Sequence, residues 1–313
     1  MRPSASPPQH SPARARLFLL CSKTLTLDRP FLSPFPVASN ARIGRVNLIK
    51  NPVFGHMSVE GNGLPGAMNH AVFLNRSDSG SVVNVDGKKR RAPIALAAQS
   101  IDPQLVGLHD TDITEYYFAP QPNVGKQIAI GRSVGGAILR DSKFDGPAAH
   151  SMFLQRGPHG NFIYRNQFTL PTCIPTPAPC AVVIMNGDDS YANLFERNVV
   201  IGGQIGFMLG GSGGNEGAMN VVRGNVIDGA GIGVRVTQQT HDVTVQGNVI
   251  RNHTVAGVYV ENSDRTQILG NVFGASTAPA VKIVSGQGYV IDGNVTSGGA
   301  IQEPGTGTVG ENL

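Results

Sequence analysis

One short phrase returns at a fixed interval in the last third of the chain. Its four copies read Gly-Asn-Val plus one further residue and begin at Gly224, Gly247, Gly270 and Gly293, so successive copies lie 23 residues apart. A fixed period of about 20–30 residues, with short apolar runs between turn residues, is typical of a solenoid in which each repeat packs on its neighbours. No other feature of the sequence constrains the fold as strongly.

The same rhythm continues upstream with interruptions. Ile128–Arg132 aligns with Met152–Arg156, 24 residues later. Counted from Asn166, the next asparagine-containing turn follows after 32 residues, and the one after that follows after 27 more. The excess over 23 residues falls in a Pro-rich stretch, Pro171–Pro179, and in a Gly-rich stretch, Gly210–Met219. We expect both to be loops, because insertions into a solenoid lie in loops on one face.

Each turn of the coil is predicted to hold three short strands. In the turn that begins at Gly224 they fall at 225–227, 232–236 and 243–245. Copies of one strand would stack as a parallel sheet with neighbours about 4.8 Å apart. The strands are too short for a βαβ fold, whose crossover needs about a dozen residues, and the leucine-rich repeat consensus is absent. With 40 Gly, 6 % aromatic residues and no Trp, the composition also suits an all-β fold with many turns.

The repeated Gly-Asn-Val-Ile phrases resemble those of right-handed parallel β-helix proteins of the pectate lyase-like (pectin lyase fold) superfamily. The resemblance covers roughly residues 43–313. That superfamily includes lyases, hydrolases, epimerases, phage tailspikes and adhesins. The resemblance therefore implies a fold, but it does not select one activity.

The resemblance also implies that the recurring asparagines form a buried ladder at a tight turn. A stacked Asn can pass amide hydrogen bonds from one turn to the next, which satisfies a polar group that costs ~1–3 kcal/mol when it is left unpaired. We therefore assign a structural role to six asparagines: Asn166, Asn198, Asn225, Asn248, Asn271 and Asn294.

Two segments are expected to lie outside the repeats. Residues 1–40 are basic and Pro-rich and are predicted to be a disordered leader, followed by a β-helix over 41–313. Residues 86–126 break the rhythm, with a short helix around Ile94–Gln99, and are predicted to be an insertion that projects from the coil.

The charge is unevenly distributed. Residues 1–45 carry seven basic residues and one acid, whereas the rest carries 18 basic and 20 acidic residues, a net charge of −2. The body therefore gives no case for nucleic acid binding. The cluster Lys88–Arg91 could attract a polyanion, although a charged loop is the simpler interpretation.

The sequence gives only weak indications of the cellular compartment of the protein. No apolar run approaches the ~20 residues of a membrane span, and residues 17–21 are shorter than the apolar core of a clear signal peptide. Fold analogy alone favours an extracellular or cell-surface location. Of the three cysteines, Cys173 and Cys180 could close one loop in an exported protein, and nothing predicts an oligomeric state.

An outward stripe of side chains is predicted on the sheet that contains 232–236. Side chains alternate along a strand, so Val234 and Val236 should point inward and Arg235 outward. The same registration places Tyr259 and Lys282 on the outer face of the next two turns. Cations can neutralise a uronate carboxylate and an aromatic ring can stack on a sugar. A solvated strand face is the plainer alternative.

The resemblance adds a role to this stripe, because in related enzymes this sheet forms the substrate groove. It makes Arg235, Tyr259 and Lys282 candidates for both catalysis and substrate binding. Phe153 and Met208 occupy comparable positions on earlier turns and are further substrate-binding candidates.

A second column of polar residues is predicted in the turn that follows this sheet. It comprises His159, Asp188, Asp189, Glu216, His241, Asp242 and Asp264. Paired carboxylates suit hydrolysis by a general acid and a general base. Asp188-Asp189 and Pro158-His159-Gly160 resemble motifs of polygalacturonase-like hydrolases. Here, however, both follow the first-sheet strand instead of preceding it, their order is reversed, and turn residues with local hydrogen bonds are the simpler interpretation.

Metal binding has little support in the sequence. The turn residues are compatible with calcium, which prefers oxygen ligands, but no spacing demands it. The run His109–Asp112 could coordinate a metal, and a solvated loop is the plainer interpretation. We therefore name no metal ligand and no cofactor.

Two classes of function remain. One is a polysaccharide-active protein, such as a lyase or an epimerase on uronate-containing glycans, in which a cation neutralises the carboxylate while a base removes the adjacent proton. The other is a non-catalytic solenoid for adhesion or glycan binding. A charged cluster at the centre of the first-sheet groove would favour the enzyme, and a flat, uncharged face would favour the scaffold.

Overall fold

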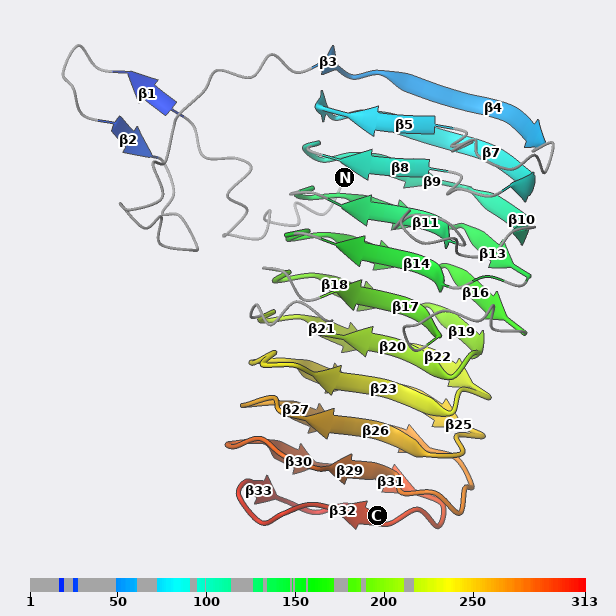
Figure 1. Cartoon of the computed structure of the whole chain (residues 1–313). Helices are drawn as coiled ribbons and strands as arrows, with labels where there is room; N and C mark the ends of the chain where they lie inside the picture. Colours follow the sequence, from blue (N-terminus) through cyan, green and yellow to red (C-terminus); the bar gives the residue numbers. More distant parts are fainter. Residues whose placement is uncertain are drawn as a thin grey trace, which may run out of the picture.

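The computed structural model of the 313-residue chain is a stack of strands wound into one coil (Figure 1). It describes residues 17–19, 25–27, 49–60, 72–90, 95–98, 100–113, 126–131, 134–146, 148, 150–155, 157–171, 180–186, 190–210 and 217–313. These residues contain strands, turns and bends but no helix. Accordingly, none of them belongs to a helix that could cross a membrane.

One strand of each turn belongs to a parallel sheet of ten strands, which we call the first sheet. Its strands are β5 (Val72–Asn75), β8 (Ala95–Ala98), β11 (Lys126–Gly131), β14 (His150–Gln155), β17 (Ala181–Asn186), β20 (Ile205–Leu209), β23 (Ile232–Thr237), β26 (Ala256–Glu261), β29 (Val281–Ile283) and β32 (Ile301–Gln302). Each strand pairs with the strand three places later in the chain, as a coil of three strands per turn requires.

The other two strands of each turn form a sheet of nineteen strands. The second strands are β9 (Gln104–Val106), β12 (Ile138–Arg140), β15 (Phe162–Tyr164), β18 (Leu194–Glu196), β21 (Val221–Arg223), β24 (Thr244–Gln246), β27 (Gln267–Leu269), β30 (Val290–Asp292) and β33 (Thr308–Val309). The third strands are β10 (His109–Ile113), β13 (Lys143–Asp145), β16 (Gln167–Leu170), β19 (Val199–Gly202), β22 (Val226–Asp228), β25 (Val249–Arg251), β28 (Val272–Phe273) and β31 (Val295–Thr296). The long strands β4 (Val53–Glu60) and β7 (Ser81–Arg90) complete this sheet at the N-terminal end of the coil.

Four short strands lie outside these sheets. β1 (Leu17–Leu19) pairs antiparallel with β2 (Leu25–Leu27), and β3 (Ile49–Lys50) pairs parallel with β6 (Ser77–Asp78). The three strands per turn predicted from residues 225–245 are confirmed as β22, β23 and β24.

The stretch in which we expected an insertion contains strands of the coil. β8 pairs with β11 in the first sheet, and β10 pairs with β7 and β13 in the larger sheet. The helix predicted around Ile94–Gln99 is wrong, because Ala95–Ala98 form β8. A short apolar run reads equally well as helix or strand when no period distinguishes the two. Residues 91–94, 99 and 114–125 of the expected insertion, and most of the expected leader, lie outside the described residues.

The interior of the coil is a continuous column of apolar side chains. Alternation along the strands turns every second side chain inward, so that Val234, Val236, Val258 and Val260 are fully covered. Aromatic rings stack between turns in the same column, as with Phe144 on Phe168 at a centroid distance of 5.3 Å. The core therefore follows the repeat and has no single centre.

The predicted asparagine ladder is confirmed. The side-chain oxygen of Asn271 accepts hydrogen bonds from the backbone amide and the side-chain amide of Asn248, both at 2.9 Å. The same pair of bonds joins every neighbouring member of the predicted set. Gly247, which precedes Asn248, has a φ of +62°, which explains why Gly opens the repeated phrase.

Two parts of the ladder system were missed. The main ladder continues to Asn312, whose side-chain oxygen accepts two hydrogen bonds from Asn294. A second ladder joins Asn161, Asn193 and Asn220 by the same pattern. All three asparagines are buried, and they hold the turn that leads into the second strands.

Candidate functional site

The predicted outward stripe forms a register column on the first sheet. Arg235 on β23 pairs with Tyr259 on β26, and Tyr259 pairs with Lys282 on β29. Each of the three is partly exposed, whereas the neighbours of each along its strand are buried. The predicted alternation therefore holds, and the three side chains form an external strip on successive turns. We call these three residues the strip.

The strip is a cation–aromatic–cation arrangement. The Arg235 guanidinium carbon lies 5.6 Å from the centre of the Tyr259 ring, and the Lys282 Nζ lies 5.8 Å from the same centre. Both distances are within the range of cation–π attraction. The two cations thus approach one ring from the two neighbouring turns.

An acidic residue that the sequence analysis missed lies beside the strip. Glu261 Oε2 accepts a hydrogen bond of 3.0 Å from Arg235 Nη2, so the guanidinium is paired with a carboxylate. Glu261 lies two residues beyond Tyr259 and in register with Thr237. The period-2 alternation that places Tyr259 outward also places Glu261 outward, so the signal was present in the sequence.

The two apolar candidates have a different environment. Phe153 and Met208 occupy the same outward column, since Met208 pairs with Arg235, but they are only 7 % and 6 % exposed. They belong to a small hydrophobic cluster with Ala129, Ala181 and Ile205. Their side chains are covered, so they do not extend the strip as an open surface.

The predicted second column also forms in register. Isolated parallel bridges connect His159 to Tyr191, Tyr191 to Ala218, Ala218 to His241 and His241 to Asp264. This column lies in the turn that immediately follows the first-sheet strands. Three of its predicted members, Asp188, Asp189 and Glu216, lie outside the described residues.

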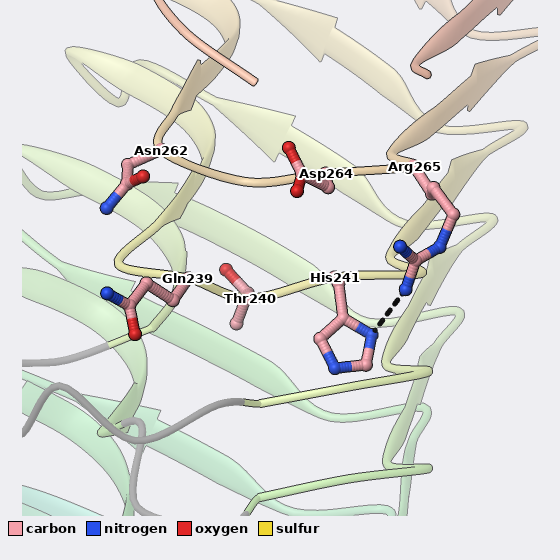
Figure 2. Close-up of a pocket in the computed structure, with 6 residues that line it drawn as sticks. All are labelled: Gln239, Thr240, His241, Asn262, Asp264 and Arg265. Carbon is pink, nitrogen blue, oxygen red and sulfur yellow. Dashed lines mark hydrogen bonds between the residues drawn. The ribbon is translucent and has the colours of Figure 1, made fainter. Parts of the chain in front are cut away.

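A polar pocket of about 320 Å³ opens in this turn, next to the strip. Figure 2 shows its lining on two successive turns of the coil. The lining comprises Gln239, Thr240 and His241 after β23, and Asn262, Asp264 and Arg265 after β26. Glu261 is the last residue of β26, so the pocket begins where the Arg235–Glu261 pair ends.

A charge cluster adjoins the pocket and shares His241 and Arg265 with its lining. His241 Nδ1 lies 2.7 Å from Asp242 Oδ2, and the Arg265 guanidinium contacts both Asp242 oxygens, at 2.6 and 2.9 Å. Arg265 Nη2 also lies 3.1 Å from His241 Nδ1 (Figure 2). Hydrogen bonding from Arg265, with a smaller contribution from His241, lowers the pKa of Asp242 to about 2. Asp242 is therefore a carboxylate at neutral pH and holds the imidazole in place.

Asp264, the acid in the pocket lining, has a structural bond as well. Asp264 Oδ1 accepts a hydrogen bond of 2.8 Å from the backbone amide of Gln287 on the next turn. Together, His241, Asp242 and Asp264 offer a positioned imidazole and two carboxylates, which is a donor set suited to proton transfer.

His159, at the other end of the column, is a buried residue. It is 5 % exposed, its ring stacks on Tyr191 at 5.2 Å, and its Nδ1 lies 2.9 Å from the Gly157 carbonyl oxygen. Burial lowers the pKa of the imidazole. These contacts indicate a packing role within the coil.

The run His109–Asp112, for which a solvated loop was the plainer interpretation, lies in a strand. His109–Ile113 form β10, with Asp110 buried and His109 Nδ1 3.7 Å from Asp86 Oδ1. Over the described parts of the chain, no three His, Cys, Asp or Glu side chains gather as metal ligands would.

Comparison with known proteins supports the same architecture. A family model described as periplasmic copper-binding protein (NosD) matches residues 182–309. A tailspike protein mutant of E. coli bacteriophage HK620, in complex with a pentasaccharide, superposes with a TM-score of 0.59 at 14 % identity, over 80 % of this chain and 49 % of that one. The chain therefore has a parallel β-helix fold, shown by its stacked parallel sheets and by this likeness.

Two further solved structures match at similar levels. The periplasmic alginate epimerase AlgG has a TM-score of 0.53 and 13 % identity, over 85 % of this chain and 61 % of that one. The Dettilon tailspike protein has a TM-score of 0.54 and 14 % identity, over 83 % of this chain and 62 % of that one. The chain thus spans about half to three fifths of the length of these proteins, and at this identity the likeness concerns the fold. No curated protein matches the chain.

Proposed function

We propose that this protein binds a uronate-containing polysaccharide along the outer face of the first sheet. The strip supports the proposal: Tyr259 offers an aromatic ring, and Lys282 and Arg235 place cations on the turns to either side of it. A sugar ring can stack on the aromatic face while an ammonium group neutralises its carboxylate. The tailspike structure with its pentasaccharide makes glycan binding a natural use of the fold.

Metal binding is less well supported as a function. The description of the matching family names copper. Copper favours imidazole and sulfur ligands, but the His241 ring of the pocket lies against the Arg265 cation, which would repel a metal ion. The donor set of this pocket therefore does not fit copper.

A second candidate is catalysis on the bound glycan. The geometry that favours it is the 2.7 Å contact between Asp242 and His241, because His241 lines the pocket next to the strip. In this candidate His241 removes the proton next to the uronate carboxylate, and Asp242 stabilises the resulting imidazolium. Return of a proton gives an epimerase, and loss of the leaving oxygen gives a lyase. One of the structural matches is described as an alginate epimerase.

Location outside the cytoplasm is part of the proposal. The matching family and AlgG are both described as periplasmic, and Cys180 is disulfide-bonded, a state that persists mainly in oxidising compartments. Both other cysteines of the chain lie outside the described residues.

Titration of glycans against variants of the strip tests the binding proposal. Lys282→Ala should weaken binding of an acidic glycan about tenfold, and its remaining affinity should depend less on salt, because one ion contact is lost. Tyr259→Ala should weaken binding without changing the salt dependence. Lys143→Ala is the matched control, since Lys143 is an exposed lysine on another sheet. Equal affinity of all variants, or no binding by wild type, would contradict the proposal.

Catalysis is tested separately on a glycan that binds. Wild type should either release unsaturated uronate or exchange the C5 hydrogen for deuterium in heavy water. His241→Asn should abolish that activity with at most a small change in affinity. If wild type binds but does neither, the non-catalytic solenoid is the correct function.

A further inference from the structure

The charges around the strip restrict the kind of acidic glycan that it can hold. We propose that the ligand is a heteropolysaccharide in which isolated acidic sugars are separated by neutral ones, and not a homopolymer with a carboxylate on every sugar. This inference rests on the proposed function and narrows its substrate class.

The first observation is that the two cations of the strip differ. The Arg235 guanidinium is paired with Glu261 at 3.0 Å. No ion pair involves Lys282 within the described part of the chain, where its Nζ faces the Tyr259 ring. The strip therefore offers one uncompensated positive charge, on the turn of β29, and a neutral ion pair on the turn of β23.

The second observation concerns the adjoining pocket. Arg265 directs its guanidinium toward both oxygens of Asp242, which already neutralises it. Asp264 remains in the lining as a further carboxylate. The pocket thus carries no net positive charge with which to attract a uronate, and its Gln239 and Asn262 amides suit the hydroxyl groups of a neutral sugar.

The spacing between turns determines which sugar of the ligand lies at each of these charges. Turns of the coil are about 4.8 Å apart, close to the length of one sugar in an extended glycan. A glycan lying along the strip therefore places roughly one sugar on each turn. An acidic sugar fits at Lys282, a ring that stacks fits at Tyr259, and a neutral sugar fits at the Arg235–Glu261 pair. A homopolymeric polyuronate would instead place carboxylates beside Glu261 and Asp264.

The test compares glycans that differ in the spacing of their acids. Hyaluronate alternates acidic and neutral sugars, gellan carries one acid in four sugars, polygalacturonate carries one on every sugar, and dextran is neutral. Per binding site at equal ionic strength, wild type should bind at least one of the two spaced-acid glycans about tenfold more tightly than polygalacturonate. Dextran should bind more weakly than that glycan.

A charge-neutral variant isolates the cause. Glu261→Gln keeps the shape but removes the negative charge beside Arg235, so affinity for polygalacturonate should rise about fivefold while affinity for the spaced-acid glycan changes little. Glu196→Gln is the matched control, because Glu196 pairs with Arg223 on another sheet. Polygalacturonate that binds as tightly as the spaced-acid glycans, with no effect of Glu261→Gln, overturns this inference but leaves the proposed function standing. If Lys282→Ala leaves the affinity for every glycan unchanged, both this inference and the proposed function are overturned.

Discussion

Removal of one mid-ladder side chain should be among the most destabilising single changes in the coil. Asn248→Ala deletes four hydrogen bonds: two to the Asn248 oxygen, from the backbone and side-chain amides of Asn225, and two from the Asn248 amide, to Val222 and Asn271. The Asn225 side-chain amide keeps a bond of 3.0 Å to the Phe195 carbonyl. The Asn225 backbone amide loses its acceptor, the Asn248 side-chain oxygen, in a region with no access to water.

These losses give a magnitude. One orphaned buried donor costs ~1–3 kcal/mol, and each remaining lost bond about 1 kcal/mol or less once relaxation is allowed, so the free energy of unfolding should fall by about 3–5 kcal/mol. Asn312→Ala is the matched control at the end of the ladder. Asn312 is partly exposed and water can replace its bonds, so we expect about 1 kcal/mol or less there.

Equilibrium urea unfolding followed by far-ultraviolet circular dichroism measures both values, since the chain has no Trp to report by fluorescence. Refolding of each variant must retrace the unfolding curve for the comparison to hold. If the two variants shift the midpoint equally, or Asn248→Ala does not shift it, the ladder contributes no specific stability and the reasoning is refuted.

Three further predictions concern pH, the disulfide and the leader. Burial lowers the pKa of His253, which is 3 % exposed, so the unfolded chain binds more protons just below pH 6.5. Stability should therefore decrease as pH falls through that value, and His253→Gln should flatten the slope whereas His109→Gln, an exposed control, should not. Reduction of the Cys180 disulfide should lower stability by ~2–3 kcal/mol if it closes a short loop to Cys173, and peptide mapping of unreduced protein that finds Cys173 as a free thiol would remove that pairing. A chain that begins at residue 41 should keep its dichroism and unfolding midpoint, and failure to fold would show that residues 1–40 cover the end of the coil.

Much of the fold could be predicted because two periods act together. The spacing of 23–24 residues aligned Arg235, Tyr259 and Lys282 on successive turns, and the period-2 alternation turned them outward. Both periods are properties of the backbone, so neither depends on details of side-chain packing. The end of the main ladder was missed because Asn312 follows Asn294 by 18 residues, outside the period.

The candidate site was harder to predict because it depends on long side chains and on turns. The pairing of Arg235 with Glu261 joins residues 26 positions apart, and their spacing along the chain does not specify which of several reachable partners an arginine selects. The pocket is lined by turn residues, whose polar character also suits an ordinary solvated turn. Burial of Phe153 and Met208 depends on packing against the outside of a sheet, which alternation alone does not reveal.

The uniform ladder also bears on how such a protein can change length. The bonds between Asn248 and Asn271 and those between Asn271 and Asn294 have nearly the same lengths, so one turn of 23 residues meets either neighbour through the same interface. Duplication or deletion of a whole turn would preserve every such interface, whereas a change of a few residues would break the register. The external strip can therefore lengthen or shorten in steps of one turn, about one sugar each. In a coil of this kind, the length of the outer face therefore changes by a whole number of repeats.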